Sequence, residues 1–160
     1  MKIVIIEDEP KIAENLKLIL MEIDSSISVI KILSSVKSSI EWLRVNQSSC
    51  DLLFMDINLT DGLSFEIFNQ IESNTPIVFV TAYDQYALDA FRVNGVDYIL
   101  KPFDKTKIKQ SLKKFKSLAQ TGSNNFNSES LKHLMEILIP KLNSTYVLFQ
   151  QLKSYHNKMQ

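Results

Sequence analysis

Four carboxylate residues and one lysine stand at places where their side chains could do chemistry together. Glu7, Asp8 and Glu9 directly follow a short apolar run near the N-terminus, and Asp56 follows a second such run. Lys101 follows a third. Grouped carboxylates need a cation between them, and their hard oxygen ligands suit Mg²⁺. A carboxylate beside Mg²⁺ and a lysine ammonium can accept a phosphoryl group, so these residue types indicate phosphoryl transfer onto an aspartate.

The apolar runs before these residues are predicted to be buried strands of a parallel sheet. Open α/β sheets build their sites at the carboxyl ends of such strands. The predicted strands are residues 2–6, 27–33, 51–55, 77–80 and 96–100. Apolar residues at helical spacing predict a helix after each strand, and these helices are expected to begin at Pro10, near Val36, at Gly62, at Asp84 and at Asp104.

Alternating strands and helices predict an α/β fold with a doubly wound, five-stranded parallel sheet that carries helices on both faces. We expect the flavodoxin-like strand order 2-1-3-4-5, which places the crevice of the sheet between strands 1 and 3. Periodicity alone does not decide the order of the strands. We adopt this order because it brings Glu7 and Asp8 close to Asp56.

The composition is typical of a globular protein from a reducing compartment. The chain has 160 residues, of which 45% are apolar, and no apolar run approaches the roughly 20 residues of a membrane helix. A signal-peptide pattern is absent and Cys50 is the single cysteine, so we expect a cytoplasmic protein without membrane contact. Residues 1–103 carry a net charge of −7 and residues 104–160 a net charge of +7. Basic stretches can bind nucleic acid or acidic partners, but we interpret this one as the solvated face of a helix.

The chain changes character after Ala119. Residues 120–128 are rich in Gly, Ser and Asn and are predicted to be a linker. Residues 129–160 are predicted to form a short C-terminal helical extension, whose apolar stripe ends near Pro140. For residues 145–152 the pattern leaves both strand and helix open.

Taken together, these motifs resemble the response-regulator receiver domain, the phosphoacceptor half of bacterial two-component signalling. The resemblance covers residues 1–119 and includes the acidic pair after the first strand, the aspartate after the third, and Lys101 with Pro102 after the fifth. Thr81 is similar to the hydroxyl residue after strand four. Tyr98 is at the position of the switch aromatic, three residues before the lysine.

This resemblance implies a role for each residue of the site. Asp56 would be the phosphoacceptor, and Lys101 would neutralise a phosphoryl oxygen. The cofactor would be Mg²⁺, held by the side chains of Asp8 and Asp56 and by the backbone carbonyl of Asn58, with Glu7 acting through water.

The resemblance also implies a partner and an output. A sensor histidine kinase would donate the phosphoryl group. Thr81 would then hydrogen-bond a phosphoryl oxygen and let Tyr98 turn inward, which would change the face formed by residues 84–119. This face carries charges of both signs that suit a two-fold homodimer contact. The face carries Tyr86 together with four charged residues, which are Arg92, Asp97, Lys105 and Lys109.

A finer resemblance, carried by residues 81–91 and 94–103, is to receivers of the LytTR class, whose usual partner is a C-terminal β-rich DNA-binding domain. About 40 residues follow the receiver here, which is too few for such a domain. We therefore expect DNA contact only through an output domain absent from this chain, and residues 129–160 would at most be its truncated start. Thr60 stands where a proline is common, which is expected to loosen the loop after the phosphoacceptor.

Two other functions stay open beside a phosphorylation-controlled switch with at most autophosphorylation and autodephosphorylation activity. The first is an Mg²⁺-dependent phosphatase of the haloacid-dehalogenase kind, in which an aspartate is the nucleophile. Its nucleophile would follow strand one in an Asp-x-Asp motif, whereas here the lone Asp56 follows strand three. The second is an interaction module that works without phosphorylation, and the complete set of site residues argues against it.

Overall fold

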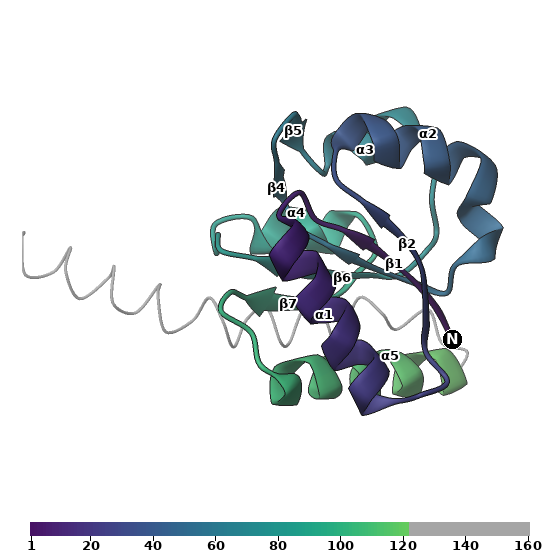
Figure 1. The fold of residues 1–160 in the computed structure, drawn as a ribbon. Helices are drawn as coiled ribbons and strands as arrows, with labels where there is room; N and C mark the ends of the chain where they lie inside the picture. Colours follow the sequence, from purple (N-terminus) through teal and green to yellow (C-terminus); the bar gives the residue numbers. More distant parts are fainter. Residues whose placement is uncertain (122–160) are drawn as a thin grey trace, which may run out of the picture.

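Parallel strands form the central sheet of this computed structural model, which describes residues 1–121 of the chain (Figure 1). The five strands of the sheet are β1 (Lys2–Ile6), β2 (Ser28–Leu33), β3 (Leu52–Met55), β6 (Ile77–Thr81) and β7 (Gly95–Leu100). Their order is β2-β1-β3-β6-β7, and each neighbouring pair is parallel. Since β4 and β5 form a separate hairpin, this is the expected order 2-1-3-4-5, and the flavodoxin-like prediction is confirmed.

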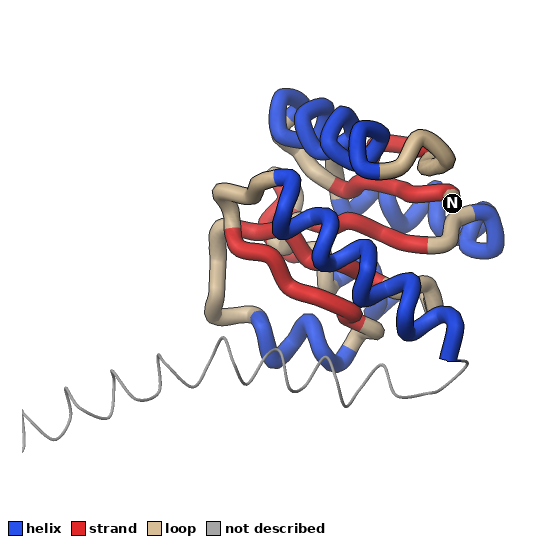
Figure 2. The backbone as a smooth tube through the Cα atoms, turned by 90° about the horizontal axis from the view of Figure 1, so that it is seen from below, coloured by secondary structure: helices blue, strands red, loops and turns tan. Residues whose placement is uncertain are grey.

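Helices cover both faces of the sheet, as Figures 1 and 2 show from two directions. One face packs against α1 (Pro10–Ile23) and α5 (Lys105–Thr121). The other face packs against α2 (Val36–Asn46), α3 (Glu66–Gln70) and α4 (Ala87–Arg92). A 3₁₀ turn, η1 (Gln47–Ser49), follows α2. The doubly wound arrangement is therefore as predicted.

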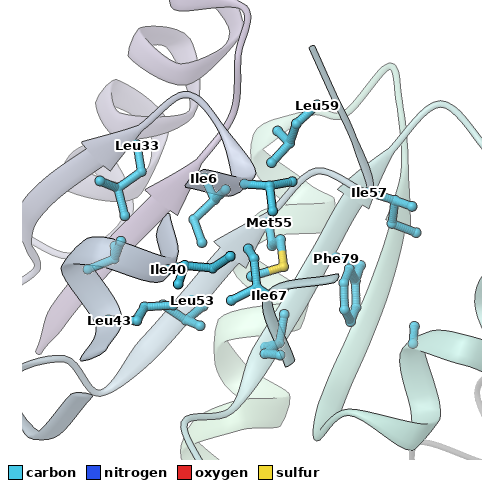
Figure 3. Packing of buried hydrophobic residues seen from close by; sticks show 14 of the residues in the cluster. Ile6, Leu33, Ile40, Leu43, Leu53, Met55, Ile57, Leu59, Ile67 and Phe79 are labelled. Atoms are coloured by element: carbon cyan, nitrogen blue, oxygen red, sulfur yellow. The ribbon is translucent and has the colours of Figure 1, made fainter. Parts of the chain in front are cut away.

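Alternate residues of the central strands point into two separate cores. In β1, Ile3 and Ile5 belong to the core under α1 and α5, whereas Val4 and Ile6 belong to the core on the α2 side. All four are fully buried, as expected for a strand with helices on both faces. Figure 3 shows the α2-side core, where the packed residues include Ile40, Leu53, Met55, Ile67 and Phe79.

The prediction that the third helix begins at Gly62 is wrong. The chain first forms an antiparallel hairpin of β4 (Asn58–Leu59) and β5 (Gly62–Leu63), and α3 begins only at Glu66. Gly62 has a φ of 144°, a backbone conformation that glycine adopts without steric strain. A Cβ at this position would lie 2.9 Å from Oε1 of Glu66, which also accepts the backbone N–H of Leu63. The glycine therefore serves a tight turn and not a helix start.

The fourth helix also differs from its prediction. Helix α4 has six residues, and Tyr86 occupies its N-cap position in place of Asp84. Asp84 contributes its backbone carbonyl, which accepts the N–H of Ala87 at 3.4 Å. Asn94 follows the helix with a φ of 63°, and Gly95 begins β7. A Cβ at Gly95 would lie 2.5 Å from the carbonyl oxygen of Ala90, so this close approach requires glycine.

The fifth helix begins as predicted and ends beyond the expected boundary. Oδ1 of Asp104 accepts the N–H of Lys107 at 2.8 Å, which is the expected side-chain cap. The helix continues past Ala119 to Thr121. The remainder of the predicted linker and the extension at residues 129–160 lie outside the described residues. Within residues 1–121, each helix is too short or too polar to cross a membrane.

Candidate functional site

The carboxyl ends of β1, β3 and β7 bring the predicted polar residues together. In the register of the sheet, Ile6 at the end of β1 lies opposite Met55 at the end of β3. The N–H of Asp56 donates to the carbonyl of Ile6 at 2.9 Å, which places Asp56 beside the loop that begins with Glu7. Parallel strands end at the same edge of the sheet, so residues distant in sequence converge there.

Glu7, Asp8 and Asp56 form a compact group of carboxylates. One oxygen from each lies within 4.8 Å of the others. Glu7 and Asp56 are buried, and Asp8 is half-buried at the opening. Glu9, the fourth acidic residue considered, is exposed at the N-cap position of α1 and lies outside this group. Its N–H instead donates to Oε1 of Glu7 at 3.1 Å.

Lys101 enters this group from the end of β7. Its Nζ lies 2.6 Å from Oδ2 of Asp56 and 2.8 Å from Oε2 of Glu7. Desolvation lowers the pKa of the Lys101 ammonium, but the hydrogen bonds to Asp56 and Glu7 more than offset this, so its pKa lies above the ordinary value. Burial raises the pKa of the Glu7 carboxyl, and the hydrogen bond from Lys101 offsets only part of this effect. The lysine therefore stays charged between two acidic groups.

Both oxygens of Asp56 have hydrogen-bond partners. Oδ1 accepts the N–H of Ile57 at 2.6 Å and lies 3.4 Å from the N–H of Asn58, while Oδ2 accepts from Lys101. Asn58 begins β4, two residues after Asp56. The carboxylate is thus held in one orientation at the end of the strand. Fixed donors of this kind are suited to stabilising charge that develops during phosphoryl transfer.

The group fits a divalent cation in charge and in ligand type. Three carboxylates and the ammonium of Lys101 together carry two negative charges when all are ionised. Carboxylate oxygens are the ligands that Mg²⁺ prefers, and water completes its octahedron. Asp8 and Asp56 are the candidate direct ligands. Glu7 is already engaged with Lys101, which agrees with an indirect role.

Thr81 and Tyr98 occupy neighbouring strands behind the site. Thr81 ends β6 and is fully buried, and its carbonyl accepts the N–H of Lys101 at 2.8 Å. Tyr98 in β7 is buried, and its hydroxyl donates to the backbone carbonyl of Tyr83. Its ring lies against Phe79 with centroids 6.3 Å apart. Tyr98 therefore already has the inward orientation that was expected to follow phosphorylation.

One contact at the site was not predicted from the sequence. The hydroxyl of Thr60 donates to Oδ2 of Asp8 at 2.5 Å, across 52 residues of sequence. The expected loosening of this loop is therefore not what the structure shows, because Thr60 ties the β4–β5 hairpin to the β1–α1 loop. The available signal was a hydroxyl residue four positions after Asp56, in the loop that follows the strand. Its acceptor could not be chosen without the tertiary structure.

A doubly wound sheet with three carboxylates and a lysine at its carboxyl edge is the architecture of a phosphoacceptor signalling domain. Residues 3–113 match the family described as the response regulator receiver domain, and the chain belongs to this family.

The curated relatives of this chain include regulators named LytT and LytR. The chain is 44% identical over 124 residues to the sensory transduction protein LytT of Bacillus cereus, covering 76% of this chain and 49% of that protein. It is 38% identical over 128 residues to the transcriptional regulatory protein LytR of Staphylococcus aureus, covering 78% of this chain and 51% of that protein. The chain thus spans about half the length of these relatives. The prediction of a LytTR-class receiver is confirmed.

A solved structure supports the fold. The response regulatory domain of the protein mrkE from Klebsiella pneumoniae superimposes with a TM-score of 0.64 at 29% sequence identity. The match covers 76% of this chain and 99% of that domain.

Proposed function

We propose that Asp56 receives a phosphoryl group from a phosphohistidine of a sensor histidine kinase. The observation that carries this proposal is the contact of 2.6 Å between Nζ of Lys101 and Oδ2 of Asp56, inside a group of carboxylates that fits Mg²⁺. A structural ion pair between Lys101 and Asp56 needs no second and third carboxylate beside it. The excess of negative charge at a buried sheet edge is explained if a cation binds there, and that cation would also offset the charge of an incoming phosphoryl group.

In the proposed reaction, an oxygen of Asp56 forms a bond to phosphorus while the bond from phosphorus to the histidine nitrogen breaks. The electron pair of the broken bond stays on that nitrogen. Bound Mg²⁺ would neutralise charge on the phosphoryl oxygens, with Asp8, Asp56 and the backbone carbonyl of Asn58 as its protein ligands. Hydrolysis of the acyl phosphate later returns inorganic phosphate and the free carboxylate.

Lys101 changes its partner in this scheme. Its ammonium now contacts Asp56, and it would contact a phosphoryl oxygen once Asp56 carries the acyl phosphate. Glu7 keeps the other side of the ammonium at 2.8 Å, which holds the lysine at the site during the exchange. Because phosphoryl transfer depends on positioning and charge stabilisation, a lysine held from behind suits this role.

Thr81 and Tyr98 would transmit phosphorylation to the face formed by residues 84–119. The Thr81 hydroxyl would hydrogen-bond a phosphoryl oxygen, and Tyr98 would be held in the inward orientation that it has here. Several charges expected to join two copies already have partners within the chain. Arg92 pairs with Asp89 at 3.7 Å, Asp97 with Lys114 at 3.3 Å and Lys105 with Glu22 at 3.2 Å. Dimerisation would exchange some of these pairs for contacts between copies.

The output is proposed to be transcriptional. The name of the Staphylococcus aureus relative describes a transcriptional regulator, and this chain is similar to about half of that protein. The receiver would control the output region of the intact regulator through the same face, and DNA would be contacted by that region. Activity of the chain itself would be limited to autophosphorylation and autodephosphorylation.

Intact mass spectrometry after incubation with a small phosphodonor and Mg²⁺ tests the proposal. We expect one phosphoryl adduct on the wild type, none on Asp56→Asn, and one on the control Asp89→Asn, which changes an exposed carboxylate of α4. Rapid multiple turnover of the donor would support the phosphatase alternative. A wild type without adduct would support the phosphorylation-independent interaction module.

A further inference from the structure

The hydrogen bond from Thr60 to Asp8 joins the hairpin after β3 to the proposed metal site. The two side-chain oxygens are 2.5 Å apart, at the short end of the range for a hydroxyl donor and a carboxylate acceptor. Thr60 lies between β4 and β5, and its own side chain is exposed. The contact therefore adds little to the hydrophobic core. Its effect falls on the orientation of the Asp8 carboxylate.

The hairpin holds Thr60 in place from both sides. Leu59 precedes it and is buried in the α2-side core. Asp61 follows it, and its carboxylate accepts the backbone N–H groups of Val36 and Lys37 at 2.7 Å and 3.0 Å. The turn that carries Thr60 is therefore anchored on both sides. The hydroxyl of Thr60 thus donates to Asp8 from this anchored turn.

A fixed donor is useful here because the carboxylates repel one another. Glu7 and Asp56 share the ammonium of Lys101, whereas Asp8 lies at the opening of the group and is more solvated. A free carboxylate in that place would gain by turning toward water. The hydrogen bond from Thr60 holds one oxygen and leaves the other available to a cation. Donors that orient a ligand in this way commonly strengthen metal binding.

We propose that Thr60 is a positioning residue that holds the Asp8 carboxylate ready for Mg²⁺. It does so with its side-chain hydroxyl, which donates to Oδ2 of Asp8. The inference rests on the proposed function because it takes Mg²⁺ as the ion of this site. It concerns the affinity for the ion and not the transfer step itself.

Isothermal titration of the metal-free chain with MgCl₂, without any phosphodonor, measures this affinity directly. Thr60→Val removes the hydroxyl and keeps the branched shape, so its dissociation constant for Mg²⁺ should rise, by about tenfold or somewhat less for an exposed donor. Thr60→Ser keeps the hydroxyl and should stay near the wild-type value. The control Thr106→Val changes an exposed threonine of α5 and should leave the value unchanged. A wild-type dissociation constant in Thr60→Val would overturn the proposal, as would a loss in Thr60→Ser that equals the loss in Thr60→Val.

A double-mutant comparison separates positioning from a general effect on the fold. In an Asp8→Asn background, Thr60→Val should have no further effect on Mg²⁺ affinity, because the group that it orients has lost its charge. An undiminished further loss in that background would show that Thr60 acts elsewhere. The phosphorylation rate should be slower in Thr60→Val only below saturating Mg²⁺. If the wild type binds Mg²⁺ but forms no adduct, the proposed function fails while the role of Thr60 stands.

Discussion

The carboxylate of Asp61 accepts the backbone N–H of Val36 at 2.7 Å, although 25 residues separate them in the sequence. The same carboxylate accepts from Lys37, and Oγ of Ser35 accepts the N–H of Ser38 at 3.0 Å. The first amides of a helix have no acceptor within the helix, so these bonds satisfy the N-terminus of α2. One of the two caps comes from the hairpin that carries Thr60. The start of α2 and the proposed metal site are thus joined through one short turn.

Replacing Asp61 by alanine should therefore destabilise the fold. We expect a loss of about 1 kcal/mol in the free energy of unfolding at neutral pH, as for other helix caps. Urea unfolding followed by far-UV circular dichroism measures it. Asp89→Ala, which removes an exposed pair with Arg92, is the control and should lose clearly less. Equal losses in the two variants would contradict the importance of the cap.

The loss in Asp61→Ala should depend on pH. Partial desolvation raises the pKa of the Asp61 carboxyl, but the hydrogen bonds from Lys37 and Val36 outweigh it, so its pKa in the folded state is lowered. A carboxyl whose pKa is lowered by folding stabilises the protein fully when the pH is above its pKa in the unfolded chain, about 3.9. This stabilisation is lost as the pH falls through its pKa in the folded protein. The difference between wild type and variant should shrink on acidification below about pH 4. If the difference in unfolding free energy between wild type and Asp61→Ala grew on acidification, the predicted direction of the pH dependence would be wrong.

Lys101→Met should make the fold dependent on divalent cations. The change leaves Glu7 and Asp56 buried together without the ammonium that now separates them. We expect a loss of about 1–3 kcal/mol in the absence of metal, because a buried charge is left without its partner. Mg²⁺ should restore more stability in this variant than in the wild type. Lys105→Met, which removes an exposed pair with Glu22, should respond to Mg²⁺ as the wild type does.

Asp8→Ala should weaken Mg²⁺ binding and phosphorylation together. Asp8 is a candidate ligand at the opening of the acidic group, so both effects have one cause. Glu9→Ala is a matched control, since Glu9 is the adjacent carboxylate and lies outside the group. Calorimetric titration with MgCl₂ and the yield of phosphoryl adduct would be compared in the three proteins. Unchanged Mg²⁺ affinity in Asp8→Ala would place the ion elsewhere.

Tyr98 should resist ionisation in the folded protein. Burial raises the pKa of its phenol well above the ordinary value, and the charge of Asp56 acts in the same direction. A group of this kind contributes stability that is fully present below its unfolded pKa of about 10 and is lost at higher pH. Ultraviolet titration of Tyr98→Phe should show as many tyrosines ionising near pH 10 as the wild type. One fewer ionising tyrosine in the variant would show that Tyr98 is accessible.

Beryllofluoride with Mg²⁺, a mimic of the phosphoryl group, should shift the chain toward a dimer. Coupling between sites is typically about 1–3 kcal/mol, so the dimerisation constant should rise by a modest factor. Sedimentation at micromolar concentrations measures the monomer fraction with and without the mimic. Asp56→Asn should not respond. The same monomer fraction in both wild-type samples would rule out phosphorylation-driven dimerisation through residues 84–119.

The sequence by itself determined the layers of this protein and the edge of the sheet at which its chemistry lies. The apolar runs before Glu7, Asp56 and Lys101 were enough to place these residues at one edge of the sheet, because a parallel sheet aligns the ends of its strands. Their closeness at that edge depends on the strand order, which the apolar pattern does not decide. Strand and helix periodicity reflects which faces of each element are buried, and this information is local to the chain.

Only the tertiary structure decided how the site side chains pair. Lys101 contacts Glu7 as well as Asp56, Thr60 binds Asp8, and the turn at Gly62 is a hairpin where periodicity predicted a helix. Each outcome depends on the register of strands and on the path of loops that lie far apart in sequence. The apolar pattern of one segment does not contain the strand register or the loop paths that bring distant segments into contact. The hydroxyl of Thr60 was visible in the sequence, but its acceptor was chosen by the fold.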